Sequence, residues 1–299
     1  DLYNTSHQLS SYDMNAPWWA EPADYDFYWQ EVDTFVVGEF VWTGFDYIGE
    51  PTPYNSDAVE EYGIKIEQTA KSSFFGIVDL CGIPKDRYYL YKSLWKPEET
   101  TLHILPHWNW EGHESETIPV FVYTNENEAE LFLNGKSLGR REKMPQSENV
   151  FEKYRLMWMD VNYEPGELKA VAYKDGENIG EAVVRTSSKP HQLRLTPERE
   201  SASAGGGELV YILVEALDID GNLCPLADDL VRFSVSGPGE IEAVGNGNPH
   251  SIEPFIADYR KLFNGKAMII LRSGNSPGVC KLEADSEALQ KTAVNIEIQ

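Results

Sequence analysis

Residues 1–98 alternate between helix-like and strand-like apolar patterns. Phe35–Phe45 is a nearly continuous apolar run, which predicts a strand buried on both faces inside a parallel sheet or barrel. Pro22–Asp33 predicts a helix that begins at a proline, and Pro84–Trp95 predicts a second helix with aromatic residues on one face. Phe74–Asp79 predicts another short strand. This order is an α/β pattern, but it is too short for a complete (β/α)8 barrel, which takes about 250 residues.

Residues 99–187 change to short alternating segments separated by turns. The predicted strands are Pro119–Tyr123, Ala129–Leu133 and Leu168–Tyr173. Asn134-Gly135 and Asp175-Gly176 each stand between strand-like runs. These dipeptides favour type I′ hairpin turns, because both central residues of such a turn need a positive φ. Several short strands joined by tight turns predict a β-sandwich.

Residues 188–299 continue in the same manner and predict a second β-sandwich, after a small polar linker at 187–190. The predicted strands are Leu209–Leu217, Val231–Val235, Lys266–Leu271 and Val294–Ile298. Two motifs suggest alternatives that the pattern disfavours. Asp218–Asn222 resembles a calcium loop but is flanked by strands, so it predicts a turn. Gly205–Gly207 lacks the Lys and the helix of a phosphate-binding loop, so it predicts a connection between strands.

The charge of the chain limits its partners. The 299 residues include 25 basic and 49 acidic side chains, a net charge of −24, which argues against a nucleic-acid partner. No apolar run is long enough to span a membrane. The first residue, Asp1, is not an initiator and no signal peptide is visible, so we expect the chain to start inside a longer protein.

The cysteines and histidines predict no metal or cofactor. Cys81, Cys224 and Cys280 are far apart and predict free buried thiols, with a Cys224–Cys280 disulfide as the alternative. His103 and His107 are four residues apart, but the Ile-Leu-Pro between them predicts a strand and a turn. A zinc site at these histidines is the alternative left open.

Aromatic residues and carboxylates gather in residues 1–98, which hold five of the eight tryptophans. The carboxylates are Asp13, Glu39, Asp46 and Glu50, and the aromatic residues around them are Trp18, Trp19, Trp42, Phe45, Tyr47 and Tyr54. Aromatic rings stack on the C–H faces of sugars while carboxylates accept hydroxyl hydrogen bonds, and glycosidases use a pair of carboxylates. The alternative is that the aromatic residues fill a core and that an acid caps a loop.

Four segments resemble glycoside hydrolase family 2 β-galactosidases, in the domain order of that family. Gly38–Tyr54 resembles the last strand and loop of the catalytic (β/α)8 barrel, and Phe75–Asp86 with the helix after it resembles the segment that closes the barrel. Ala129–Gly139 resembles the Ig-like β-sandwich after the barrel, and Asp218–Asn222 with Val244–Pro249 resembles the C-terminal Ig-like domain. The resemblance implies three domains: the C-terminal part of the barrel at 1–98, an Ig-like β-sandwich at 99–187 and a second one at 188–299.

The resemblance implies a retaining exo-hydrolase of terminal β-linked sugars, with β-galactosides as the expected substrates. In the family the acid/base glutamate follows an asparagine at the end of barrel strand 4, and the nucleophile glutamate ends strand 7. Phe35–Phe45 would be strand 8 and Ser10–Asp13 the segment just after strand 7. Both catalytic glutamates are therefore expected upstream of Asp1, so no catalytic residue is assigned here and neither Glu39 nor Glu50 is taken as the nucleophile. The missing N-terminal part of the same protein is an expected partner.

A substrate-binding role is what the resemblance carries over to this chain. Trp42 matches the tryptophan that floors the −1 sugar subsite, and related barrels have a cis peptide bond after it, here Trp42–Thr43. Asp46, Glu50 and Tyr54 lie on the loop after this strand, at the catalytic face of a barrel. Family 2 β-glucuronidases carry an Asn-x-Lys that reads the uronic carboxylate, but the corresponding residues here are Ser73–Phe75, which disfavours a uronic substrate. Mannosides and other neutral sugars stay open.

Two rival interpretations come from other classes of protein. The chain could be a non-catalytic carbohydrate-binding or adhesin-like module built from Ig-like domains, or its sandwiches could be spacers without a ligand. The family resemblance also implies a bacterial protein of the periplasm or the extracellular space. Because barrel units taken from their barrel expose strand edges and aromatic faces, we expect residues 1–98 to need either the missing half of the barrel or packing on the first sandwich.

Overall fold

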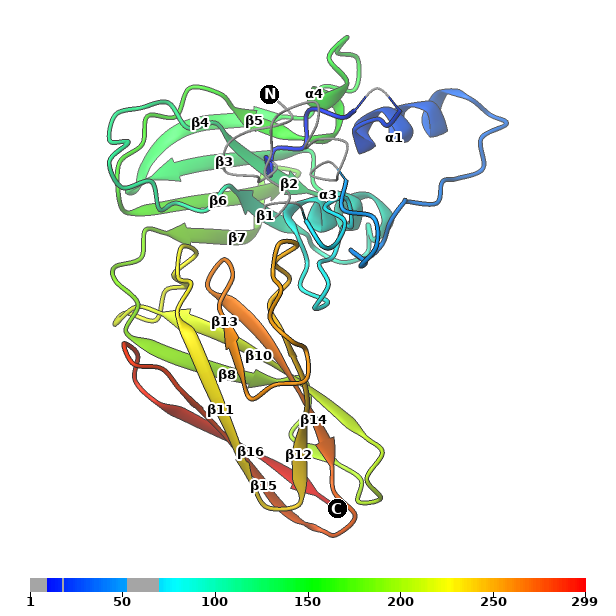
Figure 1. The fold of residues 1–299 in the computed structure, drawn as a ribbon. Helices are drawn as coiled ribbons and strands as arrows, with labels where there is room; N and C mark the ends of the chain where they lie inside the picture. The colour runs from blue at the N-terminus through cyan, green and yellow to red at the C-terminus, as the bar shows by residue number, and fades with distance from the viewer. Residues whose placement is uncertain (1–9, 18, 53–69) are drawn as a thin grey trace, which may run out of the picture. The chain divides into compact units, whose positions relative to one another are not determined.

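The computed structural model describes residues 10–17, 19–52 and 70–299 of the chain (Figure 1). The chain divides into two compact units, of which the first comprises Asp1–Asp79 and Ile83–Thr186 and the second comprises Leu80–Gly82 and Ser187–Gln299. The sequence-based boundaries of three domains stay predictions.

Two antiparallel sheets form the sandwich of the first unit. One sheet has the order β1-β2-β5, from β1 (Leu102–Leu105), β2 (Val120–Thr124) and β5 (Leu156–Trp158). The other has the order β4-β3-β6-β7, from β3 (Glu128–Leu133), β4 (Lys136–Glu142), β6 (Glu167–Lys174) and β7 (Glu177–Arg185). The strands predicted from alternation correspond to β2, β3 and β6, so they are confirmed within a residue at each end.

The two dipeptides that predicted hairpins do form tight turns. Asn134 (φ 50°) and Gly135 (φ 79°) join β3 to β4, and Asp175 (φ 52°) and Gly176 (φ 82°) join β6 to β7. Both central residues of each turn therefore have the positive φ that a type I′ turn requires. These turns fix the pairing of β3 with β4 and of β6 with β7.

Strand β2 is buried on both faces, because the first unit has three layers. Val120 and Val122 contribute to the core between the two sheets, together with Leu131. Phe121 and Tyr123 point to the opposite face, where they join a second apolar cluster with the helices. The sheet β1-β2-β5 is therefore the middle layer, between the four-stranded sheet and the helices (Figure 1).

Three helices are described in the first unit: α1 (Ala23–Val32), α3 (Asp86–Trp95) and α4 (Val150–Tyr154). The helices predicted at Pro22–Asp33 and Pro84–Trp95 are confirmed as α1 and α3, whereas α4 was not predicted. Phe27 joins the three helices, because its ring lies 5.2 Å from the ring of Tyr91 on α3 and 5.5 Å from that of Tyr154 on α4. All three rings are buried in the cluster against β2.

The two strands predicted in residues 1–98 do not form, and this prediction was wrong. Phe35–Phe45 has no strand, and most of its apolar side chains are open to solvent, with Phe35 80%, Val37 102% and Phe40 103% exposed. Phe74–Asp79 makes only isolated bridges, including the parallel bridge Phe45↔Val78. A strand that is apolar on both faces needs a neighbour on each edge and cover on each face, whereas among the described residues Phe35–Phe45 is paired only near its end, at Thr43, Gly44 and Phe45. A barrel portion is therefore not evident in the described residues.

The second unit is a sandwich of two antiparallel sheets, which confirms the strands predicted there. One sheet has the order β12-β14-β10-β8, from β8 (Gln192–Pro197), β10 (Leu209–Leu217), β12 (Gly239–Gly245) and β14 (Lys266–Ser273). The other has the order β13-β11-β15-β16-β9, from β9 (Ser201–Ala202), β11 (Leu230–Ser236), β13 (Tyr259–Lys261), β15 (Gly278–Asp285) and β16 (Thr292–Ile298). Only the short β9 pairs in parallel, with β16.

The motifs of the second unit have the structural roles that their context predicted. Asp218–Asn222 is a turn in which Asp218 Oδ1 accepts hydrogen bonds from the amides of Asp220 (3.0 Å) and Asn222 (2.8 Å). Gly205–Gly207 lies in the turn between β9 and β10. Cys224 and Cys280 have free thiols that are buried in the apolar core, as predicted, whereas Cys81 is only partly buried. The alternative Cys224–Cys280 disulfide is therefore excluded in this structure.

Candidate functional site

The segment after Trp42 is held in place by main-chain hydrogen bonds to a second segment of the first unit. The peptide bond Trp42–Thr43 is cis, as the resemblance implied. The amide of Ile77 donates to Thr43 O (3.1 Å) and that of Val78 to Gly44 O (2.9 Å). The chain after Trp42 is thereby fixed although it forms no regular strand.

Three aromatic rings form a continuous row beside this anchor, which we call the aromatic row: Trp42, Tyr47 and Phe75. The rings of Trp42 and Tyr47 have centroids 6.2 Å apart and an interplanar angle of 86°. Those of Tyr47 and Phe75 are 5.9 Å apart at 76°. Among the described residues, little covers Trp42: its side chain is 74% exposed and is open to contact with a ligand. Edge-to-face rings of this kind are preferred aromatic geometries.

Glu50 is the exposed carboxylate next to the aromatic row. The hydroxyl of Tyr47 donates a hydrogen bond to Glu50 Oε2. This hydrogen bond raises the pKa of Tyr47, because it favours the protonated phenol. Tyr47 therefore links the ring of Trp42 to a carboxylate that is able to accept hydrogen bonds from hydroxyl groups.

Asp46 is buried and its carboxylate points into the protein. Its Oδ1 accepts hydrogen bonds from the Gly76 amide (2.8 Å) and from the Ser73 hydroxyl (3.1 Å), and Oδ2 is ion-paired with Lys85. Lys85 also donates to Phe74 O (2.9 Å). Burial lowers the pKa of Lys85, and Asp46 opposes that shift. Asp46 thus holds the loop after Trp42 against residues 73–76, and its carboxylate is occupied by protein groups.

The other candidate carboxylates have separate environments. Glu39 has both carboxylate oxygens buried, and neither has a hydrogen-bond partner among the described residues. Burial and the nearby Asp26 raise the pKa of Glu39 to about 7. Asp13 forms an ion pair with Arg87 of α3. Tyr54, the fourth predicted site residue, and Trp18 lie outside the described residues.

Trp42, Asp46 and Glu50 lie on one loop, but their side chains have different surroundings. Trp42 and Glu50 are exposed, whereas Asp46 is internal. Tyr47 was among the aromatic candidates named from the sequence, whereas Phe75 was not. Tyr47 lies two residues after Phe45, so its place beside the other aromatic residues can be seen in the local sequence. Phe75 lies 28 residues after Tyr47, and only the fold brings these two rings together.

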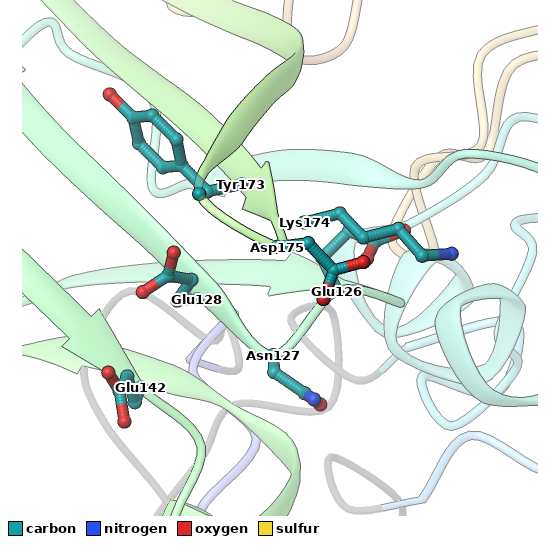
Figure 2. Close-up of a pocket in the computed structure, with 8 residues that line it drawn as sticks. Glu126, Asn127, Glu128, Glu142, Tyr173, Lys174 and Asp175 are labelled. Atoms are coloured by element: carbon teal, nitrogen blue, oxygen red, sulfur yellow. The ribbon is translucent and has the colours of Figure 1, made fainter.

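A pocket of about 330 Å³ lies elsewhere in the first unit, at the end of the sheet β4-β3-β6-β7 where β3 begins and β4 and β6 end (Figure 2). Its lining residues are Glu126, Asn127, Glu128, Glu142, Tyr173, Lys174, Asp175 and Gly176. None of the predicted site residues is among them. The two Asn-Glu pairs of the chain, Asn125-Glu126 and Asn127-Glu128, lie between β2 and the start of β3, so they belong to the sandwich and are unrelated to barrel strand 4.

The histidines that suggested zinc have other partners. His103 Nε2 lies 2.6 Å from Asp86 Oδ1, and the His103 ring stacks on Tyr89 with centroids 3.8 Å apart. His107 accepts a hydrogen bond from the Asn109 amide (3.2 Å), and burial lowers the pKa of His107. Within residues 10–17, 19–52 and 70–299, no group of three or more His, Cys, Asp or Glu side chains is placed to hold a metal ion. No helix in that part of the chain is long and apolar enough to cross a membrane.

The chain thus consists of two β-sandwich units, the first of which carries an aromatic row beside a carboxylate. Residues 193–295 match the family described as glycoside hydrolase family 2 C-terminal domain 5, and residues 115–180 match a domain of unknown function, DUF4982. The chain is 43% identical over 266 residues to the β-galactosidase BoGH2A of Bacteroides ovatus, an alignment that covers 89% of the chain and 29% of that protein. It is 34% identical to a putative β-glucuronidase of Formosa agariphila, over 84% of the chain and 23% of that protein.

A solved structure has the same fold over nearly the whole chain. The crystal structure of a β-glycosidase from Bacteroides vulgatus superposes with a TM-score of 0.83 at 33% identity, over 97% of the chain and 34% of that protein. The chain belongs to glycoside hydrolase family 2 and corresponds to the C-terminal domains of such an enzyme. It spans about a third or less of the length of each of these relatives.

Proposed function

We propose that this chain is part of a retaining, exo-acting glycoside hydrolase that cleaves terminal β-galactosides, with both catalytic glutamates upstream of Asp1. In this proposal the chain supplies part of the sugar-binding surface and two sandwiches. The aromatic row with Glu50 is the observation that carries the proposal, because an exposed ring next to a hydrogen-bonding carboxylate is the combination that suits a sugar. The 43% identity to a β-galactosidase supports the same activity.

The proposed roles of Trp42, Asp46 and Glu50 follow from their surroundings. Trp42 stacks on the sugar ring, and Glu50 accepts hydrogen bonds from its hydroxyls or orients Tyr47 to do so. Asp46 acts through the loop, since its carboxylate is bound by Ser73 and Gly76. Tyr54 is proposed as a further contact on the same loop.

A neutral galactoside is favoured over a glucuronide by the residues at 73–75. The positions that carry the uronic-acid-reading Asn-x-Lys in related β-glucuronidases are Ser73, Phe74 and Phe75 in this chain. The nearby cation, Lys85, is engaged by Asp46 and by Phe74 O. A glucuronide is the second candidate, because the chain is 34% identical to a putative β-glucuronidase.

The test compares the protein that includes the upstream residues with the 299-residue chain, each given a chromogenic β-galactoside and the matching β-glucuronide. We expect the longer protein to hydrolyse the galactoside and the chain alone to hydrolyse neither. Trp42→Ala in the longer protein should lower kcat/KM by about tenfold, since loss of an aromatic contact costs about 0.5–1.5 kcal/mol. Clear turnover by the chain alone, or a preference for the glucuronide, would contradict the proposal.

We further propose that the enzyme works in the periplasm or the extracellular space of a bacterium. The support is the family resemblance alone. Fractionation of producing cells, with galactoside hydrolysis measured in the periplasmic, medium and cytoplasmic fractions, tests this location. Activity confined to the cytoplasmic fraction would refute it.

A further inference from the structure

Arg155 is a fully buried cation whose side-chain hydrogen bonds all go to residues far from it in the sequence. It lies directly after α4 and before β5, and its side chain is 0% exposed, as is that of its ion-pair partner Asp24. Nε donates to Asp24 Oδ1 (2.8 Å) and Nη2 donates to Asp24 Oδ2. Asp24 belongs to the first turn of α1, 131 residues earlier in the chain.

The remaining hydrogen bonds of Arg155 go to two main-chain carbonyls in the segment that precedes α1 and to the hydroxyl of Tyr123. Nη1 donates to Tyr12 O and, over 3.2 Å, to the Tyr123 hydroxyl. Nη2 also donates to Asp13 O (3.2 Å). The five N–H groups of the guanidinium therefore have five acceptors, three of which are on the Tyr12–Asp13 turn or on Tyr123.

The Tyr12–Asp13 turn has further anchors on the sandwich and on α3. The Tyr12 hydroxyl donates to Pro119 O (2.6 Å), and its ring lies 4.9 Å from that of Phe121 on β2. Asp13 has a φ of 51° and its carboxylate is ion-paired with Arg87. The turn is thus fixed by side chains and carbonyls that lie more than 70 residues away in the sequence.

We propose that Arg155 is a positioning residue. Through it, the first sandwich fixes the position of the chain segment that follows the nucleophile of the enzyme. This inference rests on the proposed function, in which residues 10–13 follow the barrel strand that carries the nucleophile glutamate. Arg155 donates two hydrogen bonds to main-chain carbonyls, and these fix the position of the chain at Tyr12 and Asp13. A cation that only stabilised the fold through its ion pair with Asp24 would not need them. The sandwich is then part of the catalytic architecture rather than a spacer.

The planar guanidinium explains why lysine is not an equivalent. Lysine offers three donors from one nitrogen, so it cannot serve both oxygens of Asp24, two carbonyls and a hydroxyl together. Arg155→Lys keeps the charge but frees the Tyr12–Asp13 turn. A displacement of about 1 Å near the chemistry is enough to lower a rate by about 100-fold.

The experiment uses the protein with its upstream residues and three variants: Arg155→Lys, Tyr123→Phe and Arg140→Lys. Tyr123→Phe removes one hydrogen-bond acceptor of Arg155 with little change of shape. It keeps the proposal testable if the Arg155→Lys protein does not fold. Arg140, in β4 of the same sandwich, is the matched control, because it pairs with Glu128 at the surface. Two quantities are measured: the rate at which a 2-deoxy-2-fluoro-β-galactosyl fluoride labels the nucleophile, and hydrogen exchange in the peptide 10–17.

For Arg155→Lys we expect labelling and kcat to fall at least about tenfold while KM stays within about twofold, because positioning acts on the chemical step. Tyr123→Phe should lose about two- to fivefold and Arg140→Lys should keep its rate. Exchange in peptide 10–17 should accelerate in the first two variants only. Wild-type labelling per folded molecule in Arg155→Lys would overturn the proposal. If the unaltered protein is labelled by no glycosyl reagent, the proposed function fails, and unchanged exchange at 10–17 would then refute the positioning role separately.

Discussion

The amide of Gly76 donates a hydrogen bond of 2.8 Å to the carboxylate of Asp46, and the two chain segments are too close for any side chain at position 76. A Cβ on Gly76 would lie 2.3 Å from Asp46 N, 2.6 Å from Phe45 C and 2.7 Å from Val78 O. All three are backbone atoms, which do not rotate away. The absence of a side chain at position 76 lets the loop after Trp42 come close enough to residues 76–78 for the hydrogen bonds between them to form.

Gly76→Ala should therefore destabilise the first unit. We expect the free energy of unfolding to fall by about 1–3 kcal/mol, the usual cost of overpacking. Gly44→Ala is the matched control, because a Cβ there meets nothing within 4 Å. Urea unfolding followed by tryptophan fluorescence measures the change, since every tryptophan precedes Ser187. Equal stability of the two variants would contradict the close approach.

Mutation of Asp46 should lower the stability of the protein, whereas mutation of Glu50 should change substrate binding alone. Asp46→Ala leaves Lys85 without its buried partner, so we expect a loss of about 2–4 kcal/mol in stability together with lower activity. Glu50→Gln changes an exposed side chain, so the melting temperature should stay within about 1 °C while KM for the galactoside rises. Calorimetry and steady-state kinetics on the protein with its upstream residues separate the two. A rise in KM for Asp46→Ala without loss of stability would mean that Asp46 contacts the sugar directly.

The sandwiches could be predicted from the sequence because their signals are local. Asn134-Gly135 and Asp175-Gly176 specify their turns by their own conformational preferences, and alternation over five or six residues specifies which face of a strand is buried. Helix α1 was found for a similar reason, since Pro22 marks its start. Helix α4 was missed because its five residues are too few to show a helical period.

The rest depends on contacts between residues far apart in the sequence. Phe35–Phe45 has the composition of a buried strand, but a strand forms only where neighbours pair with it. No pattern near Asp24 or Arg155 announces that they meet, because 131 residues separate them. The candidate site was predicted in part for the same reason: Trp42 and Glu50 share one loop, whereas Phe75 reaches Tyr47 from another segment.

Glu39 should make the stability of the 299-residue chain depend on pH. Its pKa is about 7 in the folded chain, raised by burial, against 4.5 in the unfolded chain. The folded state therefore binds the proton more tightly, and ionising Glu39 destabilises it as the pH rises from about 4.5 to about 7. Glu39→Gln stays neutral and escapes this cost.

We expect Glu39→Gln to match the wild type below about pH 4.5 and to exceed it by about 1–2 kcal/mol above about pH 7, allowing for partial exposure. Thermal unfolding of both proteins across this range measures the difference. The acidic end of the series is the internal control, because both side chains are neutral there. A constant difference at all pH values would show that Glu39 has the same pKa in the folded and unfolded chains.

Arg260 is the buried cation of the second unit and organises the loop between β12 and β13. Its side chain is 1% exposed. Nη2 donates to Val244 O (2.7 Å) and Pro254 O (3.1 Å), and Nη1 donates to the Ser251 hydroxyl (3.2 Å) and Glu253 O (3.3 Å). One cation thus satisfies three carbonyls, of which that of Val244 takes part in a buried hydrogen bond.

Arg260→Ala should cost about 2–4 kcal/mol, because it leaves the buried carbonyl of Val244 unsatisfied and removes the other hydrogen bonds of the guanidinium. Arg272→Ala is the matched control: it breaks the ion pair with Glu242, whose side chains are both about a third exposed, and should cost about 0–1 kcal/mol. Native-state hydrogen exchange of the amides in β13 and β14 measures both values in the whole chain. Since β13 follows the loop that Arg260 binds, its amides should lose protection first. Equal effects of the two substitutions would mean that the loop keeps its structure without the buried guanidinium.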